Sequence, residues 1–187
     1  WQQIVDHPNY DDFWQKRNLL PHLNNIKHAV MTVGGWFDAE DLYGPLNIYK
    51  TIEETSPDAH NTLVMGPWGH GDWASERGKS VHNHIYFGDS ISTFYQREIE
   101  SRFFAFYLKG EGVRNFPEAY LFDTGKKEWK QFEVWPPKDV APLRLYFGQN
   151  GRLSINEATD EQTKFEYISD PSKPVPYTSE IEALTFT

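Results

Sequence analysis

Two short apolar runs, each closed by glycine, predict buried strands in the first third of the chain. The first covers residues 28–33 and is followed by Gly34-Gly35, and the second covers residues 61–65 and is followed by Gly66-Pro67. Runs without polar alternation are typical of a parallel sheet with helices on both faces. A helical stretch over residues 45–54 separates them. The pattern therefore predicts a βαβ unit whose two strands end at the same edge of one sheet.

A longer helix is predicted over residues 91–109. It starts after Asp89-Ser90 and ends at Gly110. Between these limits the large apolar side chains recur at helical spacing, which gives the segment one continuous apolar face. These side chains are Ile91, Tyr95, Ile99, Phe103 and Phe106.

Beyond Gly112 the apolar pattern changes to a period of two. Residues 120–122, 129–135 and 143–147 are therefore predicted to form half-buried antiparallel strands; in the last of them Leu143, Leu145 and Phe147 alternate with Arg144 and Tyr146. We therefore place a boundary near residues 113–116. The expected fold is α/β over residues 1–114, followed by part of a β-sandwich over residues 115–187.

Composition removes several classes of function. The 187 residues carry a formal net charge of −9 and no run of Lys or Arg, so nucleic acid is not an expected partner. The absence of cysteine excludes disulfides, thiolate metal sites and a cysteine nucleophile. No apolar run approaches the roughly 18 residues of a membrane-spanning helix, so no membrane partner is expected. The chain begins without Met or a signal peptide, and we expect this end to be a cut inside a domain.

Each predicted strand leads into a turn that carries an ionisable residue. Asp38 closes the sequence Gly-Gly-Trp-Phe-Asp after the first strand, and His70 closes Gly-Pro-Trp-Gly-His after the second. At the carboxyl edge of a parallel sheet these two residues could hydrogen-bond, with the carboxylate orienting the imidazole as in a serine hydrolase triad. On spacing alone, Asp38 could equally cap the following helix and His70 could be an ordinary turn residue.

Motifs along nearly the whole chain resemble one family of enzymes. Residues 34–44 and 64–71 look like its Asp and His signatures, and further motifs follow in the same order at residues 7–14, 103–110, 124–137 and 169–177. The chain is similar to the alpha-amino acid ester hydrolase and glutaryl-7-aminocephalosporanic acid acylase family, which also contains cocaine esterase and Xaa-Pro dipeptidyl-peptidases. The resemblance implies an α/β-hydrolase fold followed by a jelly-roll β-sandwich domain.

The resemblance also implies a function, and it implies that one catalytic residue is missing from this chain. Asp38 would be the triad acid and His70 the general base of a serine acyl hydrolase that cleaves small esters, amides or X-Pro peptides without metal or organic cofactor. Such enzymes place the nucleophile in G-x-S-x-G, and this pentapeptide is absent. Ser80 in Gly-Lys-Ser-Val-His lies after His70, in the wrong order. We expect the nucleophile upstream, and this piece alone to be inactive.

Several other readings stay open. His82 and His84 have the spacing of two metal ligands on a strand, with Asp72 nearby, which would suit zinc. Glu40 and Asp41 could face the cleft, or could simply favour a helix N-terminus. Trp36 and Trp68 are expected to pack under the two turns, and His60 to lie in a surface loop.

A non-catalytic alternative fits the same sequence. The aromatic-rich second half could be a binding module for carbohydrate or protein, with the α/β part as scaffold. Exposed apolar surface at a cut boundary would allow a homo-oligomer. Localisation is undetermined, although the family includes exported bacterial enzymes.

Overall fold

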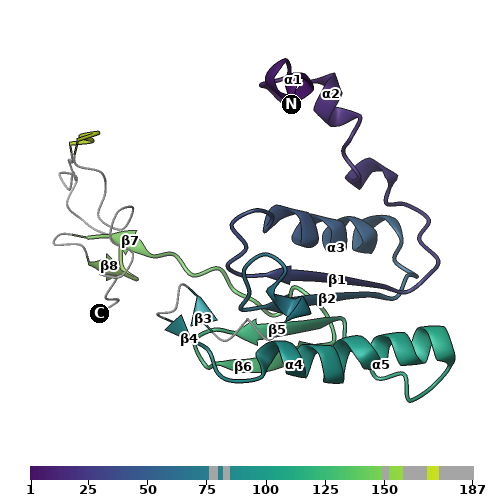
Figure 1. Ribbon diagram of the computed structural model, residues 1–187. Coiled ribbons are helices and arrows are strands. Elements are labelled where there is room, and N and C mark those ends of the chain that lie inside the picture. The colour runs from purple at the N-terminus through teal and green to yellow at the C-terminus, as the bar shows by residue number, and fades with distance from the viewer. Residues whose placement is uncertain (76–79, 82–84, 149–151, 158–167, 173–187) are drawn as a thin grey trace. The chain divides into compact units, whose positions relative to one another are not determined.

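The computed structural model describes residues 1–75, 80–81, 85–148, 152–157 and 168–172. The chain divides into two compact units, Trp1–Trp135 and Pro136–Thr187, which are described separately. The first unit contains the central sheet, the helices that cover it and the two turns that carry Asp38 and His70 (Figure 1). In the second unit, the described residues include one short antiparallel pair, β7 (Tyr146–Phe147) with β8 (Leu153–Ser154).

The central sheet has four strands in the order β1-β2-β5-β6. They are β1 (Val30–Gly35), β2 (Asn61–Gly66), β5 (Ala119–Asp123) and β6 (Glu128–Phe132). The β1–β2 and β2–β5 pairs are parallel, and β5–β6 is an antiparallel hairpin. In the first pair Val30 lies opposite Asn61 and Gly35 lies opposite Gly66, so both strands end side by side. The predicted strand, helix, strand unit is confirmed.

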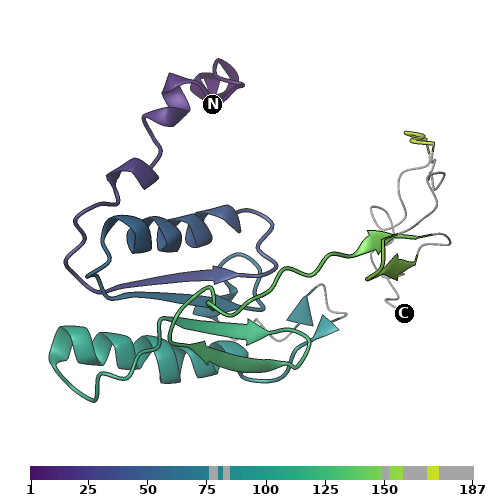
Figure 2. The same cartoon turned by 180° about the vertical axis from the view of Figure 1, so that it is seen from behind.

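Helices cover both faces of this sheet (Figures 1 and 2). Helix α3 (Tyr43–Thr55) connects β1 to β2 and lies on one face. The other face is covered by a continuous helical run made of α4 (Ile91–Phe94), the π-helical segment η3 (Tyr95–Glu100), α5 (Ser101–Phe104) and the π-helical segment η4 (Ala105–Lys109). The run ends at Gly110, whose φ of 71° is left-handed. The helix predicted over residues 91–109 is therefore confirmed.

The core has two layers because neighbouring residues of each strand point to opposite faces. On the α4 side, Val64 of β2 packs with Tyr120 and Phe122 of β5 against the helical run and Trp68; the buried helical members of this cluster are Ile91, Tyr95 and Ile99. On the α3 side the buried cluster contains Tyr49, Leu63, Met65, Ala119 and Leu121. Every residue of β2 is buried, which explains why Leu63, Val64 and Met65 form a continuous apolar run rather than an alternating one.

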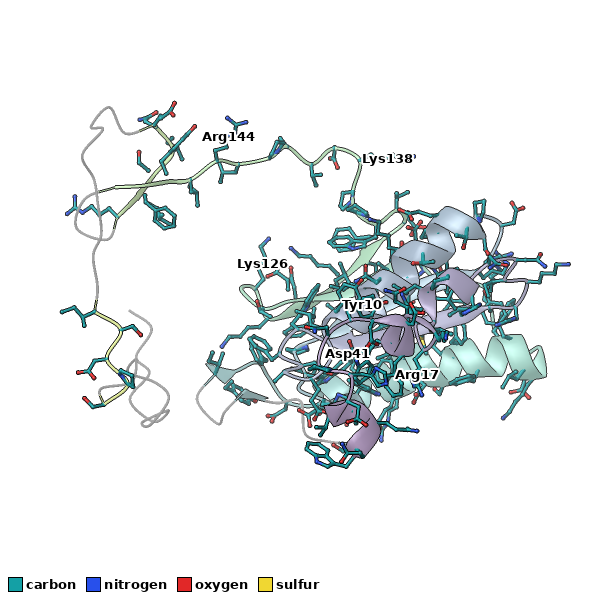
Figure 3. All side chains as sticks on the ribbon, turned by 90° about the horizontal axis from the view of Figure 1, so that it is seen from above. Tyr10, Arg17, Asp41, Lys126, Lys138 and Arg144 are labelled. Atoms are coloured by element: carbon teal, nitrogen blue, oxygen red, sulfur yellow. The ribbon has the colours of Figure 1, made fainter. Side chains whose placement is uncertain are left out.

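Short elements precede the sheet and connect β2 to α4. Before the sheet lie α1 (Gln2–Val5), α2 (Asp12–Gln15) and η1 (Leu20–His22). After β2 lie η2 (Asp72–Ala74) and the antiparallel pair β3 (Ser80–Val81) with β4 (Ile85–Tyr86). The turn between β5 and β6 carries Lys126, labelled in Figure 3, whose backbone N–H donates to Asp123 Oδ1 at 3.0 Å.

The boundary expected near residues 113–116 is wrong in position. Strand β5 begins at Ala119 and continues the parallel sheet through β2, so the strands expected to open the second domain belong to the first. The boundary between the two compact units instead falls between Trp135 and Pro136 in the sequence. The antiparallel character expected for this region is found in the β5–β6 hairpin, which adds β6 to the edge of the same sheet. A jelly-roll in the second unit stays a prediction.

A close backbone approach shapes the sheet edge where β1 and β2 end. The backbone N–H groups of Trp36 and Phe37 donate to the carbonyls of Gly66 and Trp68, at 2.9 and 3.0 Å. A Cβ at Gly35 would lie 2.2 Å from the Trp68 carbonyl oxygen. Since both partners are backbone, neither can move aside cheaply, and glycine is required at position 35.

Replacing Gly35 by Ala is expected to destabilise the protein by at least about 1–3 kcal/mol, the usual cost of overpacking a tight site. Urea or thermal unfolding of the intact protein measures this change. Gly125→Ala is a matched control, because a Cβ at Gly125 meets nothing closer than 3.4 Å. Equal stability of the two variants would contradict the proposed constraint.

Candidate functional site

The two turns that follow β1 and β2 bring Asp38 and His70 together. Nδ1 of His70 lies 3.0 Å from Oδ2 of Asp38. An ionised carboxylate can only accept, so Nδ1 carries the hydrogen of this bond and Nε2 is the ring nitrogen left for other chemistry. The two residues are 32 positions apart in the sequence, and α3 and β2 connect them, as the βαβ arrangement predicts.

Both oxygens of the Asp38 carboxylate are engaged. Oδ1 accepts from the backbone N–H groups of Glu40 at 2.9 Å and Asp41 at 3.0 Å, while Oδ2 faces His70. The Asp38 side chain is only 3% exposed. A buried carboxylate needs such partners, because an unpaired charge away from water is costly. The carboxylate is therefore held in one orientation from both sides.

His70 has the opposite environment. Its side chain is 56% exposed, so Nε2 is open to a reacting group. Glu40 Oε2 lies 3.9 Å from Nε2, which is too long for a hydrogen bond but close enough for electrostatic attraction. The imidazole also meets the edge of the Trp73 ring, with 6.3 Å between ring centroids.

The pKa values of the pair move in opposite directions. Burial raises the pKa of Asp38, but the N–H groups of Asp41 and Glu40 and the bond to His70 outweigh it, so that pKa lies below its usual value. The hydrogen bond to Asp38, followed by the charge of Glu40, raises the pKa of His70 above its usual value. Both shifts favour a carboxylate paired with an imidazole that holds a proton readily.

Glu40 and Asp41 were each expected either to face the site or to favour the start of a helix, and the structure gives them different positions. Asp41, labelled in Figure 3, accepts from the backbone N–H of Gly44 at 2.6 Å, in the first turn of α3. It therefore serves the helix start. Glu40 is exposed and lies beside His70 Nε2, so it does face the site.

Trp68 packs inside the protein as expected, and Trp36 packs against the α3-side cluster. Trp68 is completely buried, and the partly buried Trp36 donates from Nε1 to the Phe122 carbonyl at 3.1 Å. His60 is exposed, as expected, and accepts at Nδ1 from Arg114 at 2.8 Å.

Sequence reasoning missed the polar residues that tie down the histidine turn. Ser92, which is 2% exposed, accepts from Trp68 Nε1 and donates to the Asp72 carbonyl, both at 3.0 Å. One signal could have found it. Ser92 precedes Tyr95 and Ile99 by three and seven residues, so a polar residue stands on the apolar face of the predicted helix.

The metal hypothesis receives no support from the described residues. His82 and His84 lie outside the described residues, and Asp72 accepts from the backbone N–H of Gly69 at 3.1 Å. Across the part of the chain that the structure describes, no group of three or more His, Asp or Glu side chains could hold a metal ion. Ser80 is the first residue of the short strand β3. It does not lie on the strand-to-helix turn that carries the nucleophile in α/β-hydrolases.

The fold and the site together define an α/β chain with an Asp–His pair at the carboxyl edge of its parallel strands. The sequence profile of the X-Pro dipeptidyl-peptidase (S15) family matches residues 1–72. Cocaine esterase from Rhodococcus sp. (strain MB1 Bresler) is 26% identical over an alignment that covers 93% of this chain and 31% of that protein.

Two solved structures share the fold. An aminopeptidase from the marine sediment archaeon Thaumarchaeota archaeon superposes with a TM-score of 0.83 at 31% identity, over 95% of this chain and 29% of that one. An alpha-amino acid ester hydrolase superposes with a TM-score of 0.81 at 28% identity, over 95% of this chain and 30% of that one. The chain thus spans about a third of the length of these relatives. The chain is therefore similar to S15-type serine hydrolases in sequence and in fold.

In the described residues, no helix has the length and apolar character needed to cross a membrane.

The electrostatic coupling of the pair can be measured directly. Replacing Asp38 by Asn should lower the pKa of His70, because the amide provides neither the charge nor the strong acceptor that now favours the imidazolium. The chemical shift of selectively labelled His70, followed against pH in the intact protein, measures that pKa. Asp123→Asn, which removes a carboxylate bonded to Lys130, is a control that should leave it unchanged. An unaltered His70 pKa in Asp38→Asn would contradict the coupling.

Proposed function

We propose that this chain supplies the acid, Asp38, and the general base, His70, of a Ser-His-Asp triad in a serine acyl hydrolase. The observation that carries the proposal is the 3.0 Å contact between a buried carboxylate and Nδ1 of an exposed imidazole, at the edge where α/β enzymes build their sites. The nucleophilic serine is proposed to lie outside this chain. Kinship with enzymes that are named as an esterase, an ester hydrolase and an aminopeptidase supports the same class.

The proposed reaction follows the geometry of the two nitrogens. Asp38 holds the Nδ1–H tautomer, so the lone pair of Nε2 takes the proton of the serine hydroxyl as Oγ attacks an ester or amide carbonyl. The imidazolium that forms is stabilised by the Asp38 carboxylate, and its proton then passes to the leaving alcohol or amine. Water, deprotonated in turn by Nε2, attacks the acyl-enzyme and releases the acid. None of these steps uses a metal or organic cofactor.

The substrate is proposed to be a small ester or amide, or a short peptide. The relatives are named as an esterase, an ester hydrolase and an aminopeptidase, which supports proposing both ester and peptide bonds as targets. The oxyanion-hole donors would lie with the serine. We further propose that the second unit is part of a jelly-roll β-sandwich, and the antiparallel pairing of β7 with β8 is in keeping with this.

Covalent labelling of the intact protein with a fluorophosphonate probe tests the triad. A single serine in a G-x-S-x-G sequence should react, and labelling should fall by at least about 10³-fold in His70→Ala, because an unactivated serine is a weak nucleophile. His60→Ala removes an exposed histidine from a distant loop and should label like the parent. No labelling of a folded parent would refute the proposal and favour the binding module.

The pH dependence of turnover gives a second test. The base must be neutral to accept a proton, so kcat/KM should rise with pH through the pKa of His70 in the free enzyme. Because that pKa is raised by Asp38 and Glu40, the midpoint should lie above the ordinary value of 6.5. Glu40→Gln should move it to lower pH. A profile that is flat from pH 5 to 9 would be incompatible with His70 as the base.

A further inference from the structure

His70 has few contacts of its own, so its position depends on the backbone that carries it. In the part of the chain that the structure describes, its ring contacts Asp38, Glu40 and the edge of Trp73. Glycines stand on both sides, and Gly71 has a left-handed φ of 76°. Two flanking glycines give the turn little stiffness of its own. Something outside the turn must hold it if His70 is to stay against Asp38.

The helical run after the turn makes this connection through Ser92. Its hydroxyl accepts from the indole N–H of Trp68, two residues before His70, and donates to the carbonyl of Asp72, two residues after it. One buried hydroxyl therefore bridges both ends of the turn. Trp68 is fully buried and Ser92 nearly so, which makes both bonds costly to lose.

Gln96 makes a second attachment from the same face of the helical run. It lies four residues after Ser92, so the two side chains are neighbours on the helix surface. Its Nε2 donates to the carbonyl of Trp73 at 2.8 Å. Ser92 and Gln96 thus bind two consecutive carbonyls, those of Asp72 and Trp73, directly after the histidine turn.

We propose that Ser92 and Gln96 are positioning residues that hold His70 within hydrogen-bonding distance of Asp38. The proposal rests on the proposed function of His70 as the base. Neither side chain needs to touch the substrate. Both act by fixing the turn that carries the imidazole, and the resulting geometry keeps Nε2 aimed at the serine hydroxyl.

The test compares Ser92→Ala and Gln96→Glu in the intact enzyme. Gln96→Glu keeps the shape but replaces the donor with an acceptor that repels the Trp73 carbonyl. Each variant should lower kcat by about 10- to 100-fold with KM within about twofold, because displacement of a catalytic group by about 1 Å costs that much. In Ser92→Ala the His70 pKa, from the pH profile and from labelled histidine, should fall toward its ordinary value. Gln96→Glu adds a negative charge that acts on this pKa in the opposite direction, so the loss of kcat at constant KM is the readout for that variant.

Matched controls exist on the same chain. Ser101 donates its hydroxyl to the Arg97 carbonyl at 2.7 Å on the exposed side of the same run, and Gln15 donates to the Tyr10 carbonyl at 3.4 Å. Ser101→Ala and Gln15→Glu repeat the chemical changes away from the turn, and should keep parental kcat and His70 pKa. A role limited to stability would lower the melting temperature of Ser92→Ala without moving that pKa.

The outcomes separate the two proposals. If His70→Ala abolishes labelling while both positioning variants match their controls in kcat and His70 pKa, the positioning role is wrong and the triad stands. If His70→Ala still labels fully, the triad itself is wrong. Should Ser92→Ala fail to fold, Gln96→Glu decides, since that side chain is only partly buried.

Discussion

The parallel pairing of β1 with β2 is the constraint on which the rest of the site depends. Its register sets Gly35 opposite Gly66, so two turns leave the sheet side by side and each delivers one ionisable side chain. A shift of one residue would move a strand's side chains to the opposite face and carry its turn out of line. Backbone hydrogen bonds from Trp36 and Phe37 to the carbonyls of Gly66 and Trp68 then hold the two turns together, and the absence of a Cβ at Gly35 lets the backbones come this close.

Much of this first unit follows from local sequence patterns. Glycine after an apolar run marks the ends of β1 and β2, and the apolar face from Ile91 onward marks the long helical run. The contact between Asp38 and His70 could be anticipated because parallel strands joined by a helix must end at one edge. In such a fold, knowing where strands end is nearly the same as knowing which side chains meet.

Two features lie beyond that kind of reasoning. Strand β5 carries a short apolar run that fits a buried parallel strand or a half-buried antiparallel one, and only its long-range pairing with β2 decides between them. Periodicity describes the faces of a segment and not its partners, which is why the boundary was misplaced. Ser92 poses the converse difficulty, since a polar residue on an apolar helix face indicates a buried partner without identifying it.

The Asp38–His70 pair places stability and the proposed activity in different ranges of pH. The lowered pKa of Asp38 contributes stability above its ordinary value of 3.8, and this is lost as pH falls through the folded value. The raised pKa of His70 contributes stability that is complete below 6.5 and is lost as pH rises through the folded value. The pair is therefore most stabilising when the imidazole is charged, whereas a general base must be neutral. A turn held only by the ion pair would loosen as the base became active. Neutral tethers such as the Ser92 hydroxyl and the Gln96 amide do not titrate, so they can keep His70 in place across the pH at which it works.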